Sequence, residues 1–443
     1  MTDSTAADRG VSPLDRAHGL RLAGKSEDAL RLAASIVAAS TDDVGAAYLV
    51  ARLLLDQNRV QPAGQAAEAL VERFCRRGDL PAACLAAHLG FEAGGFAENA
   101  LQQIAQIFAK GSKRVSDVSP RPPPLPVDVK VAPFFAKLAG AALADAAEKA
   151  LARFLETKDR VPDNAALPRL PLFGDLDPAM LAKLLGAFEL REAKTGEYVV
   201  RQGDEGREAF VLARGVLNVV RERAAGATVL AVLGPGAIFG EMALVSDAPR
   251  AASVVAVEPC HIFVAQRAHL EALAKKDPTI GRELGRFCHG RMVSNLLRHS
   301  VLLSAIEPGK RQELVSHFTT RTFQPGAVLV RQGEEAGRLF LIASGGVDVR
   351  STDAEGEGVV LAQLGPGDVV GEISLVLRRP ATADVIAAHT TVALELTRDQ
   401  FQEAIRQHPT LLSELYDLAT KREEETRSVV AQAALDVSDV VLL

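Results

Sequence analysis

Residues 239–252 read FGEMALVSDAPRAA, and residues 370–383 read VGEISLVLRRPATA. Both stretches place Gly-Glu after an apolar residue and continue with small and apolar residues. Each reaches a proline at the same distance from its glycine, since 249 − 240 and 380 − 371 are both 9. The same motif therefore occurs twice in the chain.

The sequence around the two motifs is also repeated. LPLFGDLDP at 170–178 parallels SVLLSAIEP at 300–308, and VVRQGDEG at 199–206 parallels LVRQGEEA at 329–336, both at an offset of 130. LGPG at 233–236 matches LGPG at 364–367 at an offset of 131, which places one inserted residue between Gly215 and Leu233, in an expected hairpin turn. A unit of roughly 125 residues is duplicated in tandem.

Short runs rich in β-branched residues fill each copy. In the first copy they are residues 197–203, 209–215, 216–223, 228–234, 251–258 and 260–266, separated by glycine-rich turns. Many short strands at even spacing predict an antiparallel barrel or jelly roll. Helical patterns follow each set of strands, and Thr397 opens one of them with the capping-box sequence TRDQ.

Residues 12–109 are rich in Ala and Leu and have helical periodicity. Helix breaks at Gly24-Lys25, Asn58-Arg59 and Gly94-Gly95 are spaced by 34 and 36 residues. A helix-turn-helix period near 34 residues resembles tetratricopeptide repeats. The alternative is an irregular helical bundle.

A proline-rich stretch, residues 110–134, separates this helical region from the rest and predicts a semi-rigid linker. It contains Lys113-Arg114-Val115-Ser116, which is either solvated linker or, as its resemblance to the linkers of protein kinase A regulatory subunits implies, a kinase inhibitor or substrate string. The predicted division is a disordered N-terminus at 1–11, a helical-repeat domain at 12–109, the linker, one connecting helix at 135–165, jelly rolls at 166–298 and 299–432, and a tail at 433–443. The fold class is therefore multidomain, an all-α region followed by two β jelly rolls with flanking helices.

Composition excludes several classes of protein. The chain has 443 residues, is 48% hydrophobic and carries a net charge of −6, which argues against nucleic acid and membrane surfaces as partners. Its four cysteines form no CxxC pair or zinc-ligand pattern, so no metal is expected and a reducing cytoplasm is the predicted location. No signal peptide or membrane-spanning run is evident. No P-loop, GxSxG or nucleophile–histidine pattern indicates an enzyme.

The first motif resembles the phosphate-binding cassette of cyclic-nucleotide-binding domains, and RQGD, the strands around Gly215 and LGPG fit the same family. The likeness covers about residues 165–430. It implies that Gly240, Glu241, Met242, Ala243, Arg250 and Ala251 bind a cyclic nucleotide, with no further cofactor. It further implies that the Ala243 amide and the residue after the arginine touch the phosphate. Ala251, in place of the Thr or Ser that accompanies guanine recognition, favours cAMP over cGMP.

Elementary chemistry is consistent with these roles. Gly240 lets a ligand approach the main chain, and a short helix opening there directs N–H groups outward. Glu241 can accept the ribose 2′-hydroxyl proton. Arg250 can donate a charge-assisted hydrogen bond to the phosphate. The alternative for Glu241 and Arg250 is a surface ion pair.

The second motif departs from this pattern at one position. Gly371, Glu372, Ile373, Ser374, Ala381 and Thr382 are its counterparts, and Ala381 takes the place of Arg250. The second site is predicted to be structural or weakly binding. Alternatives are a substituted cation, Arg378 or Arg379, or another ligand. Lids over the base could come from Phe287, Met292 or Leu296 in the first site and Tyr416 in the second, although core packing explains these residues equally well.

These observations predict a cytoplasmic cyclic-nucleotide receptor, most simply for cAMP, that passes ligand binding at the first site to a protein partner through the N-terminal helical region. No DNA-binding helix-turn-helix, membrane pore or enzyme domain is visible as an output. The alternatives are a scaffold that no longer responds to nucleotide, or a receptor for cGMP or cyclic di-GMP.

Overall fold

The structure is a computed structural model. The residues it describes are 11–40, 42–95, 97–116, 130–159, 161, 167–168, 170–223, 226–300, 303, 306–307, 311, 314, 317–335, 337–352 and 358–440. The predicted N-terminal segment up to residue 10 and most of the proline-rich linker lie outside them.

The chain divides into two compact units. The first comprises residues up to 204 together with 208–241 and 250–284, and the second comprises 205–207, 242–249 and 285–443. The first unit therefore holds the helical region and most of the first jelly roll, whereas residues 242–249 of the first motif group with the second jelly roll.

The helical region consists of helix-turn-helix pairs, and its breaks lie where the sequence predicts them. Gly24, Asn58 and Gly94 have left-handed φ angles of 77°, 63° and 77° and separate the two helices of successive pairs. The helices are α1 (Pro13–Leu22), α2 (Ser26–Ala39), α3 (Val44–Asp56), α4 (Val60–Arg77), α5 (Leu80–Glu92) and α6 (Ala97–Phe108). Their small side chains are almost wholly buried, which allows close helix packing.

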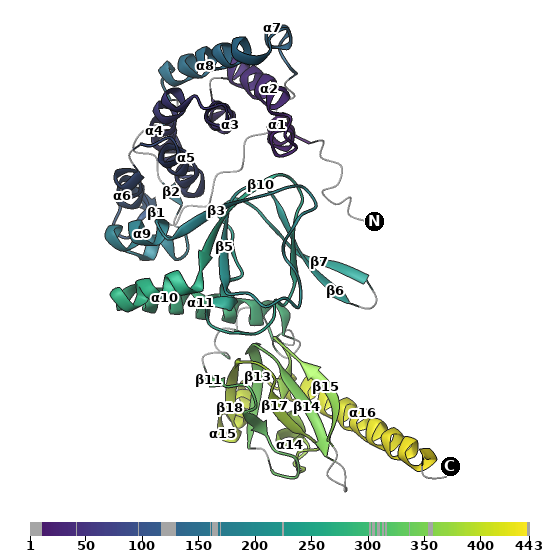
Figure 1. Ribbon diagram of the computed structural model, residues 1–443. Helices are drawn as coiled ribbons and strands as arrows, with labels where there is room; N and C mark the ends of the chain where they lie inside the picture. The colour runs from purple at the N-terminus through teal and green to yellow at the C-terminus, as the bar shows by residue number, and fades with distance from the viewer. Residues whose placement is uncertain are drawn as a thin grey trace. The chain divides into compact units, whose positions relative to one another are not determined.

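The segment after α6 differs from the predicted linker and connecting helix. Val115 and Ser116 form β1 (Val115–Ser116), which pairs in parallel with β2 (Leu167–Pro168), so the basic string is part of a small sheet. The helix expected at 135–165 is instead two, α7 (Pro133–Ala136) and α8 (Gly140–Glu156). Gly140 adopts φ +53°, which interrupts the helix. Helix α8 packs on α2 and α3 (Figure 1).

The first jelly roll is built from two four-stranded antiparallel sheets, ordered β3-β10-β5-β8 and β4-β9-β6-β7. The strands are β3 (Phe188–Ala193), β4 (Tyr198–Val200), β5 (Glu208–Arg214), β6 (Leu217–Arg223), β7 (Gly226–Leu233), β8 (Ile238–Phe239), β9 (Ser253–Ala256) and β10 (Cys260–Gln266). Every run predicted as a strand overlaps one. Strands β3 and β8 were not predicted, because FELREA has no β-branched side chain and the consecutive charges of Arg191 and Glu192 break its alternation, and because β8 has only two residues.

The second jelly roll repeats this topology, with sheets β11-β18-β13-β16 and β12-β17-β14-β15. Its strands are β11 (Thr319–Phe323), β12 (Val328–Val330), β13 (Arg338–Ser344), β14 (Val347–Thr352), β15 (Gly358–Leu364), β16 (Val369–Val370), β17 (Asp384–Ala387) and β18 (Thr391–Thr397). The two jelly rolls confirm the predicted fold class. The extra residue is in the second copy, because 364 − 345 is 19 and 233 − 215 is 18, so it lies between Gly345 and Leu364 and not between Gly215 and Leu233 as expected.

Helices flank both jelly rolls. They are the 3-10 helix η2 (Phe173–Asp175), α9 (Pro178–Leu185), α10 (Arg267–Lys276), α11 (Pro278–His299), α14 (Glu372–Val376), α15 (Arg398–Gln407) and α16 (Thr410–Val440). Thr397 caps α15 through the predicted capping box with Gln400. Helix α16 continues to Val440, through most of the segment predicted as a tail at 433–443.

Charged and aromatic side chains join the helical region to the first jelly roll. Arg21 of α1 bonds Glu192 of β3 at 2.5 Å, and Arg214 of β5 pairs with Asp15 of α1. The His18 and His261 rings meet edge to face with centroids 5.2 Å apart. We call these six residues the interface cluster. Because its ion pairs and rings lie mostly buried, it fixes the helical region on strands β3, β5 and β10.

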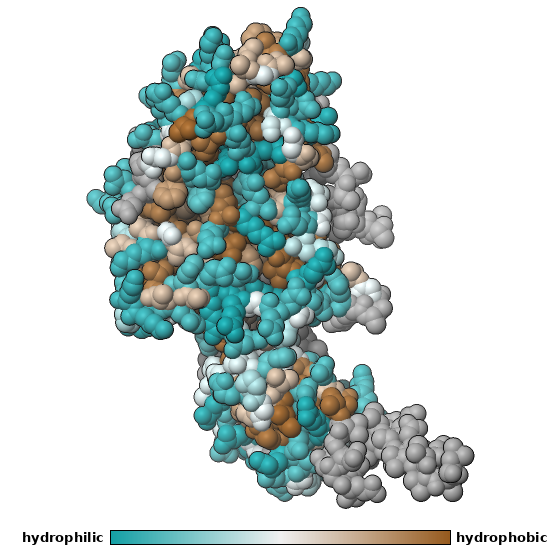
Figure 2. Space-filling model, in the orientation of Figure 1, coloured by the Kyte–Doolittle hydropathy of each residue, from teal (hydrophilic) through white to brown (hydrophobic). Residues whose placement is uncertain are grey.

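No helix among the described residues is long and apolar enough to cross a membrane. On the face shown in Figure 2, hydrophobic residues form separate patches among hydrophilic ones.

Candidate functional site

Gly240 forms the base of the first motif, between β8 and the 3-10 helix η3 (Glu241–Leu244). Its φ is +71°, a backbone conformation that residues other than glycine rarely adopt. A Cβ atom at this position would lie 2.9 Å from Arg250 Nη1 and 3.0 Å from Phe210 Cδ2. Position 240 therefore has no room for a side chain.

The Arg250 guanidinium lies against this glycine. Its Nη1 donates to the Gly240 carbonyl at 3.2 Å, and its Nη2 donates to the Glu208 carbonyl at 3.0 Å. The guanidinium carbon is 5.6 Å from the centre of the Phe210 ring, which stacks on Phe239. Both hydrogen bonds thus end on neutral carbonyls, so the positive charge can attract an anion.

Burial lowers the pKa of Arg250, while the carboxylates of Glu208, Glu241 and Asp204 oppose that shift. The arginine remains charged at neutral pH, because a guanidinium starts from a very high pKa. Its main chain is also fixed, since the Arg250 amide donates to the Asp204 carbonyl at 2.8 Å. These contacts hold the half-buried cation in one position beside Gly240.

The other predicted residues of the first site lie in two compact units. Glu241 is buried, with 4% of its surface exposed, and Ala251 is exposed, both within the first unit. Met242 and Ala243 belong to the second unit, where Ala243 is buried and Met242 packs against a core that includes Met292. The structure brings Gly240 and Arg250 into direct contact.

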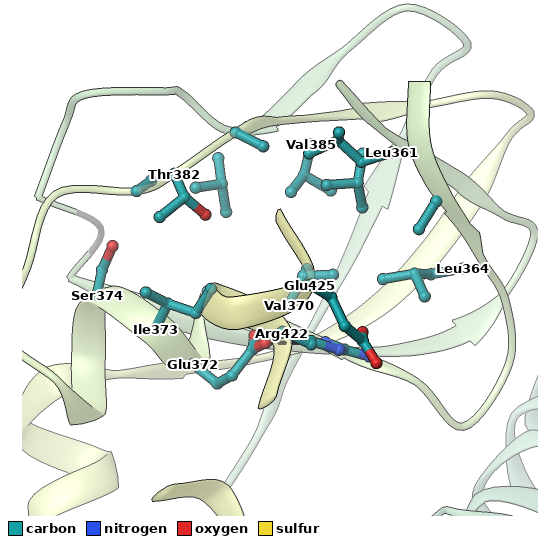
Figure 3. A pocket seen from close by; sticks show the side chains of 16 residues that line it. Leu361, Leu364, Val370, Glu372, Ile373, Ser374, Thr382, Val385, Arg422 and Glu425 are labelled. Carbon is teal, nitrogen blue, oxygen red and sulfur yellow. Dashed lines mark hydrogen bonds and ion pairs between the residues drawn. The ribbon is translucent and has the colours of Figure 1, made fainter. Parts of the chain in front are cut away.

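The second motif opens into a cavity of about 180 Å³. Residues of the motif and of strands β12, β14, β15 and β17 line it, together with Arg422 and Glu425 of α16. All six predicted second-site residues are among the lining residues, namely Gly371, Glu372, Ile373, Ser374, Ala381 and Thr382. Figure 3 shows the hydroxyls of Ser374 and Thr382 opposite the apolar side chains of Leu361 and Leu364.

Glu372 is paired with a cation from the C-terminal helix. Its Oε1 accepts a hydrogen bond from Arg422 Nη1 at 2.9 Å, and the same nitrogen donates to the Val369 carbonyl. A second pair, Arg379 Nη1 to both oxygens of Glu423 at 2.8 and 3.0 Å, also holds α16. The carboxylate of the second motif is therefore buried together with its counter-charge.

Arg422 and Glu425 had no signal in the sequence, because they lie about fifty residues from the motif on a helix that carries no related pattern. The proposed lid residues also have other positions. Met292 and Leu296 are buried in the core of the second unit, and Tyr416 is 54% exposed and does not line the cavity.

Both jelly rolls match a known protein family. The family described as "Cyclic nucleotide-binding domain" matches residues 190–277 and 320–408. The regulatory subunit of cAMP-dependent protein kinase from Yarrowia lipolytica is 30% identical over 234 residues, which cover 53% of this chain and 58% of that protein. The corresponding subunit from Dictyostelium discoideum is 30% identical over 212 residues, covering 47% and 62%. The chain therefore spans less than two thirds of these relatives.

Solved structures with similar chains include the regulatory domain of Toxoplasma gondii PKA with cAMP, with a TM-score of 0.27 and 27% identity over 57% of this chain and 92% of that one. The Thermus thermophilus catabolite activator protein gives a TM-score of 0.27 and 30% identity over 31% and 62% of the two chains.

Proposed function

We propose that this chain, which carries two cyclic nucleotide-binding domains in tandem, is a regulatory protein that binds cAMP at its first site and passes the signal to a protein partner. The observation that carries the proposal is the contact of Arg250 with Gly240. A cyclic phosphate has one delocalised negative charge, and a guanidinium whose hydrogen bonds end on carbonyls can turn toward it.

Each residue of the first site has a separate task. Arg250 neutralises the phosphate, and Gly240, which has no side chain, lets the phosphate approach the main chain once Arg250 turns toward it. Glu241 accepts the ribose 2′-hydroxyl proton, and Met242 and Ala243 complete the turn around the phosphate. Ala251 offers no side-chain hydroxyl to a guanine base, which favours cAMP.

Strand β5 connects this site to the helical region. Its first residue, Glu208, supplies the carbonyl that holds Arg250, and its last, Arg214, forms the ion pair with Asp15 of α1. Turning Arg250 toward a phosphate releases the Glu208 carbonyl. That release alters the strand that bears on α1, so the helical region is the output surface for a partner.

The proposed role is regulatory and not enzymatic. The curated relatives described above are regulatory subunits by name. The four cysteines are all buried free thiols, consistent with a protein of the reducing cytoplasm.

Calorimetric titration of the full chain with cAMP and cGMP tests the proposal. Arg250→Ala is expected to weaken cAMP binding about tenfold to over a hundredfold, because a hydrogen bond to a charged group contributes about 1.5–3 kcal/mol. Arg191→Ala is a matched control, since Arg191 is a half-buried arginine of the same jelly roll that pairs with Glu197. Equal cAMP binding by the two variants, or no heat with the unaltered chain, would refute the proposal.

A further inference from the structure

The cavity of the second jelly roll differs from the first site in its charge. Arg422 is the single basic residue among its lining residues, all of which the structure describes, and two carboxylates, Glu372 and Glu425, accompany it. Arg422 is bound to Glu372 and to the Val369 carbonyl. Transferring a phosphate anion into this cavity would therefore add an unneutralised charge, which is costly in a partly buried site.

Neither arginine of the second motif supplies the missing charge. Arg378 and Arg379 are exposed and absent from the cavity lining, and Arg379 is paired with Glu423. The alternative of a substituted cation within the motif is thus not supported by their positions.

The cavity nevertheless has the features of a ligand site. Ser374 is only 2% exposed, and its hydroxyl, which faces the cavity, has no hydrogen-bond partner (Figure 3). Thr382 adds a second hydroxyl on the same side, and Val330, Leu361 and Val385 are among the apolar residues of the wall. Ligand pockets typically combine an apolar wall with a few such polar groups.

We propose that the second cavity binds an uncharged purine nucleoside. The apolar wall accommodates the base, and a ribose diol suits the Glu372–Arg422 pair, since a hydroxyl can donate to the carboxylate and accept from the guanidinium. A bound nucleoside gives the Ser374 hydroxyl the hydrogen-bond partner that it lacks in the structure. This inference rests on the proposed function, because it treats the cavity as the counterpart of the first site.

The main chain at Ala381 matches that at Arg250, so selectivity depends on the side chain. The Ala381 amide donates to the Glu334 carbonyl at 2.9 Å, as the Arg250 amide does to the Asp204 carbonyl at 2.8 Å. The Gly333 amide donates to Ala381 as the Gly203 amide does to Arg250, at 2.9 Å in both cases. Ala381→Arg therefore places a guanidinium at the equivalent position.

The experiment uses the full chain with Arg250→Ala, which removes the cation of the first site and leaves the second cavity unchanged. Adenosine and guanosine are titrated against cAMP by calorimetry. We expect one of the two nucleosides to bind with a stoichiometry of about one, and cAMP to bind at least about tenfold more weakly than it binds the chain that keeps Arg250. Adding Ser374→Ala should weaken the nucleoside about threefold to tenfold, whereas Ser344→Ala, a buried serine of β13 outside the cavity, should have no effect. Adding Ala381→Arg should produce cAMP binding.

Two results would overturn the inference. One is cAMP binding to the Arg250→Ala chain as tightly as either nucleoside, which would mean that Arg422 leaves Glu372 to serve the phosphate. The other is no binding of either nucleoside to a chain whose circular dichroism is unchanged. A different result would refute the proposed function, namely that the chain that keeps Arg250 does not bind cAMP.

Discussion

Acid should loosen the first compact unit through His18 and His261 of the interface cluster. Both imidazoles are buried, with 1% of their surface exposed. Burial lowers the pKa of His18 well below its usual value of 6.5, and the positive charge of Arg214 adds to that shift. Burial also lowers the pKa of His261, although Glu192, whose Oε1 is 3.0 Å away, opposes part of the shift.

The sign follows from where the proton binds. In the unfolded chain both histidines bind a proton as the pH falls through 6.5, whereas in the folded chain they stay neutral to lower pH. Their contribution to stability is present above that value and is lost as the pH falls below it. Each histidine that stays neutral in the folded chain lowers the free energy of unfolding by about 1.4 kcal/mol at about pH 5.5 relative to pH 7.5. Because Glu192 favours protonated His261, His18 and His261 together should lower the free energy of unfolding by between about 1.4 and 2.8 kcal/mol.

Glu192 does not contribute within this range. Burial opposes its ionisation, but His261 and Arg21 lower its pKa to about 2, so its stabilising effect is lost only as the pH falls below the usual 4.5. The histidines can therefore be measured separately from the carboxylate.

Urea unfolding followed by far-ultraviolet circular dichroism at the two pH values measures the effect. The control is the double variant His18→Gln/His261→Gln, in which the chain's other histidines still titrate. The unaltered chain should lose more stability on acidification than the variant, by the amount given above. If the double variant does not fold, His18→Gln alone should remove about 1.4 kcal/mol of the pH dependence. An equal loss in the unaltered chain and the variant would refute the assignment of these two imidazoles as the acid-sensitive groups.

Three further outcomes are expected. Arg214→Ala removes the ion pair with Asp15 and should leave cAMP affinity within about twofold. It should abolish the change in amide hydrogen exchange that we expect cAMP to produce in α1. An unchanged exchange response would show that β5 does not carry the signal. Gly371→Ala should destabilise the second jelly roll far more than Gly326→Ala. The two glycines have similar φ angles of +84° and +83°, but a Cβ at 371 would collide with the Arg338 carbonyl oxygen, whereas one at 326 meets nothing within 4 Å. Equal midpoints of urea unfolding for the two variants would contradict this. Arg379→Ala should speed amide exchange in the turns of α16 around Glu423 by removing both bonds to that residue. Unaltered exchange there would mean that this pair does not hold the helix.

Local sequence patterns predicted much of the fold. Gly24, Asn58 and Gly94 end helices because they can adopt left-handed φ angles, and the Thr397 capping box acts over only three residues. The repeat offset placed both motifs correctly between strands. Strand β3 was missed because its sequence, FELREA, lacks the β-branched residues that identify the other strands.

Contacts between distant residues could not be predicted in this way. Arg21 and Glu192 are separated by 171 positions, and Arg422 and Glu372 by 50. Such ion pairs depend on how the helices pack, and no local pattern of charges encodes their partners. The absence of an arginine at position 381 was visible in the sequence, whereas the paired charges of Glu372 and Arg422 that line the second cavity required the structure.

We propose that Arg250, which has no counterpart in the second motif, restricts cyclic-nucleotide binding to one of the two related domains. Equilibrium dialysis counts the bound cAMP at a free concentration about tenfold above the dissociation constant of the unaltered chain. We predict about one cAMP per chain, and no more than about half as much for Arg250→Ala at the same concentration, because the substitution weakens binding at least about tenfold. Two molecules of cAMP per chain, or one that persists in Arg250→Ala, would contradict the account.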